Sequence, residues 1–435
     1  MGAALVLVIV VLAGPALAQT QTWPSQSTPP TVPLYNLPRP DYDQPGIAVG
    51  SFLVLPSASE VATYDDNIFA SEQSRAGDFV NTTNESIAAA SQWSRHSLSG
   101  RLYSAQQAYA SHGSENANTY GAEGSGRLDI TGQSFLQLDG SFVQQPEQRG
   151  ALQASTNLAT RPVFNTTTGR LTYDQSFNYW EERAQASVQD VDFITGGNEF
   201  RDGSVYTVRN RVVFKLSEEL GAFIEGSNAW QDWDLNPSQR NSDNLTGLIG
   251  ISAQIPTVIQ GELGIGVLRE SYSNSAFKPL VTPALTGSLT WNILPLTSIV
   301  ASAQRTVVGT ETFCNAATGI CQISSGASTP VVTAFSSQRN TFQSTGGQIG
   351  VQHEFWHNIL GEANVAYEHD VFDFNGLVDD TYVLSGDVHY LLNRYSEIDF
   401  NFAHTQRTAN LSADRTFNSG PYTDNIVFLT LKVGL

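Results

Sequence analysis

The sequence predicts an all-β fold, a single transmembrane antiparallel up-and-down β-barrel of 16–18 strands. Three observations predict it. Apolar and polar residues alternate with a period of two in segments of roughly 10 to 15 residues. The connections between these segments alternate in length, and a strand pattern continues to the last residue, Leu435. In a membrane barrel the apolar face of each strand contacts lipid and the polar face lines the lumen.

The composition excludes two other classes of protein. Only 14% of the 435 residues are charged, and 41 acidic residues outnumber 22 basic ones, which gives a net charge of −19. A nucleic-acid-binding protein needs a basic surface, so nucleic acid is not an expected partner. No internal apolar run reaches the length of about 18 residues that a transmembrane helix needs, which excludes a helical membrane protein.

The start of the chain is predicted to carry a signal peptide, residues 1–18. An apolar stretch runs from Ala3 to Ala13, and Ala16-Leu17-Ala18 forms a small-x-small cleavage site. A transmembrane anchor is disfavoured because the apolar stretch is short and ends in Gly14-Pro15. Residues 19–48 contain seven of the 18 prolines, and proline cannot donate to a strand ladder. We therefore expect an extended or disordered periplasmic tether there, and the barrel at 49–435.

The barrel segment contains 18 candidate strands, although 16 remains an alternative count. The strands begin near residues 49, 79, 98, 119, 135, 164, 179, 204, 220, 243, 258, 279, 296, 339, 358, 379, 395 and 422. Short connections lie near 94–96, 131–133, 217–219, 255–257, 293–295 and 392–394, and long ones cover 65–78, 147–163, 191–203, 310–338 and 408–421. Short periplasmic turns alternating with longer external loops are typical of outer-membrane barrels. An even number of strands places both termini in the periplasm.

The tryptophans favour the same fold. Trp93, Trp180, Trp291 and Trp356 lie beside short connections, whereas Trp230 and Trp233 lie at the end of a long one. An indole ring prefers the boundary between hydrocarbon and water. The sequence therefore predicts one aromatic girdle at each end of the barrel.

The last segment is a strand with one apolar face, which carries Val427, Leu429, Leu431, Val433 and Leu435. It resembles the terminal recognition strand of bacterial outer-membrane barrels, which usually ends in Phe where this chain has Leu435. The resemblance implies the barrel-assembly machinery as a partner. The alternative is an edge strand in a secreted β-sandwich.

The only two cysteines, Cys314 and Cys321, lie in the longest connection with six residues between them. In an oxidising exported compartment, a pair this close is expected to form a local disulfide. A metal site would need further ligands, and none is obvious nearby. We therefore predict a disulfide that stiffens this loop.

Residues 353–357, His-Glu-Phe-Trp-His, match the zinc-protease pattern H-E-x-x-H. That chemistry requires both histidines on one face of a helix, with the glutamate as general base. The preceding residues 346–350, Gly-Gly-Gln-Ile-Gly, disfavour a helix, and strand alternation resumes at Ile359. No Ser-His-Asp cluster can be assembled elsewhere. The sequence thus predicts no enzyme activity, no catalytic residues, no metal and no cofactor.

A short motif resembles a known family. Leu55-Pro56 lies in the first strand, Tyr64-Asp65-Asp66-Asn67-Ile68-Phe69 lies at its end, and Asp78-Phe79 begins the second strand. These segments resemble the outer-membrane β-barrel porin family of type 2. The resemblance implies a porin-like channel in the outer membrane of a Gram-negative bacterium. The family's association with exopolysaccharide loci further implies export of a polysaccharide.

The cluster Asp65-Asp66-Asn67 has two interpretations. Asp and Asn side chains bond their own backbone in tight turns, so the cluster could simply end the first strand. Three hard oxygen donors could also form a surface calcium site. We favour the turn and leave calcium open.

A barrel of 16–18 strands encloses a water-filled lumen unless something plugs it. The predicted tether is too short for a separate plug domain, but the loop at 310–338 could fold inward. Alternation predicts that twelve charged residues line the pore: Arg101, Arg127, Arg170, Arg183, Arg209, Arg211, Glu225, Glu262, Glu362, Glu368, Asp387 and Asp399. The basic ones come from the first half of the barrel and the acidic ones from the second. This arrangement predicts either opposed walls with a transverse field or a mixed, wet lumen.

Two functions follow from these predictions. The first is an outer-membrane channel, either a general porin for small polar solutes or a conduit for an exported polysaccharide. The second is a structural or adhesive barrel that acts through its external loops without transport. Outer-membrane lipid is an expected partner in both cases.

Overall fold

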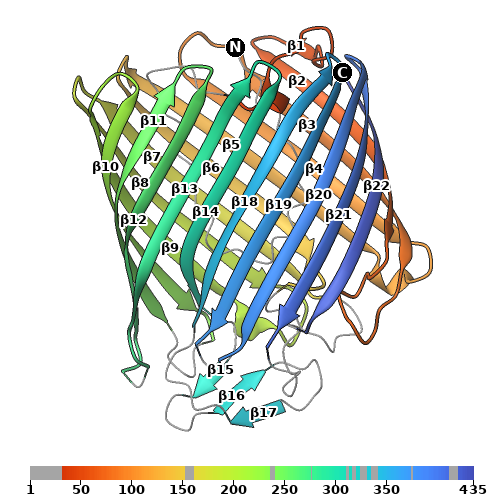
Figure 1. The fold of residues 1–435 in the computed structure, drawn as a ribbon, viewed down its shortest axis with the longest axis vertical. Helices are drawn as coiled ribbons and strands as arrows, with labels where there is room; N and C mark the ends of the chain where they lie inside the picture. The colour runs from red at the N-terminus through yellow and green to blue at the C-terminus, as the bar shows by residue number, and fades with distance from the viewer. Residues whose placement is uncertain are drawn as a thin grey trace.

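The computed structural model describes residues 32–151, 161–235, 241–275, 277–309, 313–315, 320–323, 331–334, 341–373, 376–410 and 420–435. The predicted signal peptide and residues 19–31 of the predicted tether lie outside this part of the chain. The described residues form a closed antiparallel barrel (Figure 1). Its 19-stranded sheet consists of a ring of 18 strands and a short strand, β1, which pairs with β2 outside the ring.

The strands of the ring follow the order of the sequence. The first half consists of β2 (Phe52–Asp65), β3 (Asp78–Ser91), β4 (Ser97–Tyr109), β5 (Ala117–Thr131), β6 (Ser134–Pro146), β7 (Val163–Ser176), β8 (Trp180–Phe193), β9 (Gly203–Lys215) and β10 (Leu220–Trp233). The second half consists of β11 (Ser242–Ile255), β12 (Ile259–Tyr272), β13 (Leu280–Leu294), β14 (Thr297–Gly309), β18 (Thr341–Trp356), β19 (Ile359–Phe372), β20 (Val378–Asn393), β21 (Ser396–Ala409) and β22 (Tyr422–Gly434). Short 3-10 helices lie outside the strands: η1 (Leu34–Asn36), η2 (Gly113–Glu115) and η3 (Glu199–Arg201).

The predicted strands are confirmed, and each begins within three residues of its predicted position. The largest difference is in the first strand, which is predicted from residue 49, whereas β2 begins at Phe52. Gly50 has a φ of 61°, in the left-handed region that glycine adopts at no steric cost. The chain therefore turns there, and β1 (Ile47–Val49) folds back on β2 with Val49 opposite Phe52.

The ring closes where its first and last strands meet. β2 pairs with β22 from Ser57 opposite Gly434 to Asp65 opposite Ile426; we call this pairing the seam. Because the ring has an even number of strands, β2 begins and β22 ends at the same end of the barrel (Figure 1). The short turns are at that end, here called the short-turn end, and the long connections are at the other, the long-loop end.

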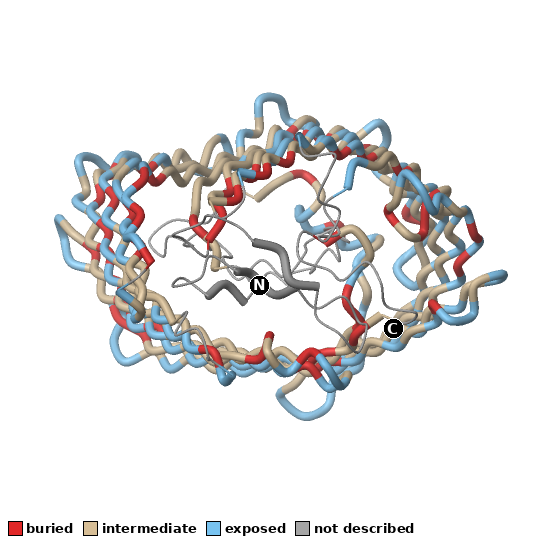
Figure 2. Tube along the Cα trace, turned by 90° about the horizontal axis from the view of Figure 1, so that it is seen from below, coloured by how far each residue is buried: buried red, intermediate tan, exposed pale blue. Residues whose placement is uncertain are grey.

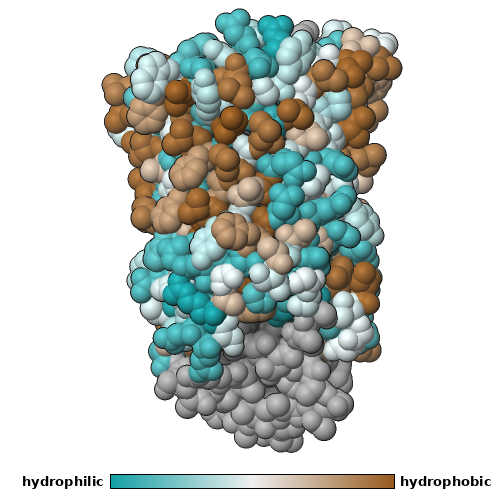
Figure 3. Space-filling model, turned by 90° about the vertical axis from the view of Figure 1, so that its right-hand side faces the viewer, coloured by the Kyte–Doolittle hydropathy of each residue, from teal (hydrophilic) through white to brown (hydrophobic). Residues whose placement is uncertain are grey.

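The outer surface of the barrel is apolar. Along β12, for example, Leu263, Ile265 and Val267 are each more than half exposed, and the residues between them face inward. Figure 3 shows apolar side chains gathered over the outside of the strands on one face. Exposed apolar side chains in this alternating pattern are the lipid-facing surface of a membrane barrel. No helix in the described part of the chain is long and apolar enough to cross a membrane.

The tryptophans agree with the predicted girdles with one exception. At the short-turn end, Trp93, Trp291 and Trp356 are 44%, 37% and 66% exposed, and Trp230 is 39% exposed near the long-loop end. Trp233 is only 6% exposed. The prediction that Trp233 belongs to the interfacial girdle is wrong, because its position in β10 places it on the inner face.

The buried apolar residues of the ring strands lie on the inner wall, since a single closed sheet has no second layer to pack against. Seen end-on, the strands form an oval ring with buried stretches along the wall (Figure 2). One inner cluster contains Phe277, Phe342, Phe372 and Leu377, and another contains Phe223, Leu248, Leu268, Leu280, Ala284 and Val307. Both clusters lie among β10–β20, so apolar side chains cover part of the inner wall there.

Candidate functional site

The inner wall carries all twelve residues that the sequence predicts to line a pore. Each lies on the strand face opposite the exposed apolar side chains, as Glu262 does between the outward-facing positions of β12. From β4 to β9 these residues are Arg101, Arg127, Arg170, Arg183, Arg209 and Arg211; from β10 to β21 they are Glu225, Glu262, Glu362, Glu368, Asp387 and Asp399. Strand alternation alone therefore assigns their faces.

Several of these residues form an inner-wall ion-pair network across β7–β12. Its members are Asp174, Glu181, Arg183, Arg209, Arg211, Glu225 and Glu262. Arg183 contacts Asp174 at 2.5 Å and Glu181 at 3.1 Å. Arg209 contacts Glu225 at 2.6 Å, and Arg211 bridges from Glu225 to Glu262 at 3.6 and 2.7 Å. These arginines are thus paired with carboxylates of the same wall, so this stretch of the wall carries both signs of charge.

An aromatic ring on the wall positions Arg211. The Phe223 ring lies beneath the guanidinium at 3.7 Å from its centroid, a cation–π distance. Phe223 itself lies over Gly250 and Gly264, where a Cβ atom would press on the ring. The two glycines therefore let the ring lie flat against the wall, and Arg211 crosses it to reach Glu262.

A polar cavity lies beside this network at the short-turn end. Its volume is about 120 Å³, and charged side chains from β8, β9 and β12 line it together with the turn before β10. The charged residues that line it are Glu181, Arg183, Arg211, Lys215, Glu218, Glu219 and Glu262. A space of this size holds several water molecules, since each needs about 10–15 Å³. The cavity is thus a polar recess in the inner wall that is large enough for water.

The opposite wall is covered at the same end by residues 32–46, here called the N-terminal segment. Leu34 donates its amide to Ser298 Oγ at 3.0 Å, and its side chain is 1% exposed against Leu360 and Leu391. This part of the predicted periplasmic tether is therefore neither free nor disordered. It contains η1 and packs inside the mouth of the barrel, because its apolar Leu34 finds a pocket there.

Polar groups of the N-terminal segment also bond to the wall. Arg39 is 4% exposed; it forms an ion pair with Glu354 at 3.0 Å and donates to the Leu34 carbonyl. The Tyr35 hydroxyl donates to Asp387 at 2.9 Å. Burial, followed by the charge of Asp387, raises the pKa of Tyr35, so the hydroxyl stays protonated and remains a donor.

The H-E-x-x-H motif belongs to this contact. Residues 353–356 end strand β18, and a helix, which the zinc-protease arrangement requires, is not present there. His353 shares a hydrogen bond with Thr297, Glu354 holds Arg39, and His357 lies edge-on to the Tyr42 ring at 5.7 Å. The motif residues therefore bind the N-terminal segment and neighbouring strands.

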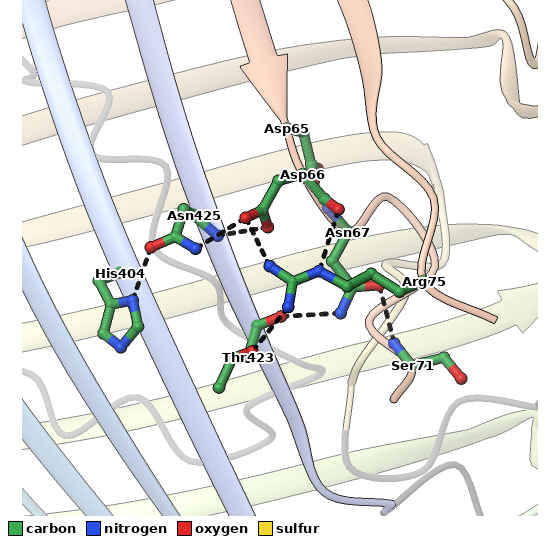
Figure 4. Close-up of polar contacts among 8 residues, drawn as sticks. All are labelled: Asp65, Asp66, Asn67, Ser71, Arg75, His404, Thr423 and Asn425. Atoms are coloured by element: carbon green, nitrogen blue, oxygen red, sulfur yellow. Dashed lines mark hydrogen bonds and ion pairs between the residues drawn. The ribbon is translucent and has the colours of Figure 1, made fainter. Parts of the chain in front are cut away.

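Within the motif Tyr64–Phe69, residues 65–67 connect the two sides of the seam at the long-loop end (Figure 4). Asp65 accepts a hydrogen bond from the Asn67 amide at 2.7 Å, the bond expected of a turn that leaves a strand. Asn67 is 1% exposed; its side chain donates to the Thr423 carbonyl and accepts from the Ser71 amide. The motif thus turns the chain and ties it to β22.

Asp66 completes this contact. It accepts hydrogen bonds from the amide and the side chain of Asn425 at 2.9 and 2.8 Å, and pairs with Arg75 at 2.5 Å. Burial raises the pKa of Asp66, but these hydrogen bonds and the Arg75 charge outweigh it and hold the pKa below its ordinary value. Asp66 is therefore ionised at neutral pH.

The long connections are tied together by buried ion pairs that sequence reasoning missed. Glu115 in η2 is 2% exposed and contacts Arg149 at 2.8 Å and Arg161 at 3.4 Å. Arg201 in η3 pairs with Glu147 from the preceding long connection. Loop sequences carry no periodicity. The sequence therefore shows that these connections contain charged residues, but not which of them pair.

The longest connection contains a separate three-stranded sheet, β15 (Phe313–Asn315), β16 (Ile320–Ile323) and β17 (Val331–Ala334), beyond the strand ends (Figure 1). This part of the loop does not fold into the ring as an inward constriction. The backbone register places Cys314 opposite Cys321. Opposed Cα atoms are about 4.5–5.5 Å apart, which is within the range of a disulfide. The disulfide stays a prediction.

The model of a family described as "Putative beta-barrel porin 2" matches residues 39–317 and 316–434, which span the whole ring. No curated protein matches the chain.

Three solved structures from Pseudomonas aeruginosa are similar to the chain. A mutant of the ferric enterobactin receptor PfeA is 9% identical, with a TM-score of 0.45, over 88% of this chain and 80% of its own. OccK2 (OpdF) is 9% identical, with a TM-score of 0.46, over 89% and 99%. The outer membrane protein OpdK is 10% identical, with a TM-score of 0.43, over 88% and 98%.

Proposed function

The chain belongs to the putative beta-barrel porin 2 family, and from this premise we propose that it is a passive channel for small polar solutes. A porin-like barrel of this family is located in the outer membrane of a Gram-negative bacterium, with its apolar outer surface in lipid. Its short turns then face the periplasm and its long connections face the outside.

The observation that carries the proposal is the inner-wall ion-pair network. Arg211 is 3% exposed and Glu225 is 5% exposed, and removing such charges from bulk water is costly unless they are paired. Replacing a buried ion pair by apolar residues is often neutral or stabilising, so packing alone does not explain these charges. A wall of paired charges beside a polar recess supports a lumen that polar solutes can enter.

The charge balance supports a preference for cations. The chain has a net charge of −19, and the arginines of the network are neutralised by carboxylates of the same wall. Paired arginines leave little positive charge to attract anions into the lumen. We therefore expect a cation-selective pore.

The N-terminal segment supports small solutes over a polymer. It packs inside the periplasmic mouth and bonds to β14, β18 and β20. An exopolysaccharide conduit, which the family resemblance implies, would have to displace this segment during export. Polymer export is the second version of the channel hypothesis.

Planar-bilayer recording of the folded full-length protein tests the proposal. We expect single-channel steps with a reversal potential that shows cation preference, and liposome uptake of small sugars that ends at larger oligosaccharides. Anion selectivity would contradict the acidic pore. An absence of conductance would favour the structural or adhesive barrel, and loss of exopolysaccharide secretion in a deletion strain would favour the polymer conduit.

A further inference from the structure

We propose that Asp65, Asp66 and Asp424 bind one calcium ion that bridges the two sides of the seam. Their carboxylate oxygens lie within 4.8 Å of one another. Asp65 ends β2, Asp66 follows it, and Asp424 lies near the start of β22. Calcium prefers hard oxygen ligands, above all carboxylates, and tolerates water in the remaining positions. The site is independent of channel activity, because it lies in the seam at the outer end of the barrel.

The environment of Asp424 points to a bound ligand. The residue is 7% exposed, and its Oδ1 atom has no hydrogen-bond partner within the described part of the chain. A buried carboxylate oxygen without a donor is destabilising, and two further carboxylates beside it add electrostatic repulsion. A cation between the three carboxylates removes both penalties at once.

The local charge fits a divalent cation. Arg75 pairs with Asp66 at 2.5 Å (Figure 4). The formal charges of three carboxylates and one guanidinium sum to two negative charges, which one calcium ion neutralises.

The ligand set differs from the one that the sequence suggests. In the sequence, Asn67 stands beside Asp65 and Asp66 as a third oxygen donor. Its side-chain oxygen instead accepts from the Ser71 amide, and its nitrogen donates to Thr423. Asp424, distant in sequence, takes its place because β22 pairs with β2 only in the closed barrel. The site therefore exists only after closure, and calcium stabilises the closed form.

Thermal unfolding of the full-length protein in detergent, after treatment with EDTA, tests the site with Ca²⁺ as the probe. Over the range of about 0.1–1 mM that is typical of extracellular sites, we expect the unfolding midpoint of the unmodified protein to rise. Asp424→Asn keeps the shape of the side chain and removes its charge, so the rise should be lost. Terbium(III) offers a second probe, with luminescence excited through Tyr422 on the same strand face and a Kd weakened roughly tenfold or more by the variant.

Asp202→Asn is the matched control. Asp202 is also a buried carboxylate near the long-loop end, 9% exposed, but it lies in the connection before β9. This variant should keep the full response to calcium. Asp66→Asn serves as a second test variant should Asp424→Asn fail to fold. The proposal is overturned if Ca²⁺ leaves the unmodified protein unchanged, or if both test variants respond like it. A midpoint that rises on acidification instead of with Ca²⁺ also overturns it, since it would indicate a proton shared among the carboxylates.

Discussion

Two stretches of the inner wall neutralise buried charges in different ways. On β7–β12, arginines such as Arg211 pair with carboxylates of other strands in the same stretch. On β18–β21, Asp379 pairs with Arg407 within the wall, but Glu354 and Asp387 take their partners, Arg39 and Tyr35, from the N-terminal segment. The first arrangement is part of the barrel, and the second depends on a segment outside it.

The pairs within the wall are expected to stabilise the barrel itself, whereas the contacts of the N-terminal segment can be broken without breaking the ring. Breaking a pair within the wall leaves a buried charge attached to the strand ladder, so the barrel itself loses stability. Detaching the N-terminal segment leaves every pairing of the ring intact and opens the periplasmic mouth. We therefore expect substitutions in the wall network to lower the stability of the barrel. Substitutions that detach the N-terminal segment should instead raise its conductance.

The largest expected effect is on stability, from Arg211→Ala. The substitution leaves Glu262 without its 2.7 Å partner and removes one of two arginines from Glu225. Removing one partner of a buried pair costs about 3–5 kcal/mol. Urea unfolding followed by tryptophan fluorescence measures the loss, and Lys278→Ala, in an exposed loop, is the control. Equal stability of the two variants would contradict a structural role of the network.

The second expected effect is on conductance, from Arg39→Ala. Arg39 donates to the Leu34 carbonyl and pairs with Glu354, so its loss should release the N-terminal segment. We expect a higher single-channel conductance and faster proteolysis within residues 32–46. Because the ring stays closed, barrel stability should fall by only about 1–2 kcal/mol.

Arg39→Lys refines this test. It keeps the charge but loses the bidentate guanidinium. Its conductance should therefore lie between that of the unmodified protein and that of Arg39→Ala. Unchanged conductance in Arg39→Ala would show that the N-terminal segment does not restrict the pore.

The sequence could predict those features of the barrel whose signal is local. Alternation along each strand predicts both the strand and its inner face, and residues as far apart as Arg101 and Asp399 lie on that face. That they line an open pore stays a prediction. The hydrophobic pattern and the turn lengths are local, so they predict the ring of strands and its two ends.

Contacts between distant segments leave no such local signal. The pairing of Arg39 with Glu354 joins residues 315 positions apart, and the meeting of Asp65 with Asp424 depends on ring closure. A proline-rich segment looks the same in sequence whether it is free or packed through one leucine. Alternation likewise assigns faces but says nothing about which charges touch, so the pairing of Arg211 with Glu262 could not be predicted.

The seam offers a third prediction, smaller than the effect at the wall. Asn67→Ala leaves the Thr423 carbonyl and the Ser71 amide without their side-chain partner. Leaving buried polar groups unsatisfied costs about 1–3 kcal/mol. The measurement is the urea midpoint, with exposed Asn81→Ala of β3 as the control. An unchanged midpoint would mean that strand pairing alone holds the seam.

The smallest expected effect is the response of the seam to pH. The folded pKa of Asp66 lies below its ordinary value, so the folded state favours the ionised form. Its contribution to stability is present above the unfolded pKa of about 4 and is lost as the pH falls through the folded pKa. Thermal unfolding between neutral and acidic pH should therefore show a falling midpoint, and Asp66→Asn should lose part of that fall. If Asp66→Asn follows the same curve as the unmodified protein, the acid sensitivity arises from carboxylates elsewhere, and the hydrogen bonds from Asn425 do not depend on the charge of Asp66.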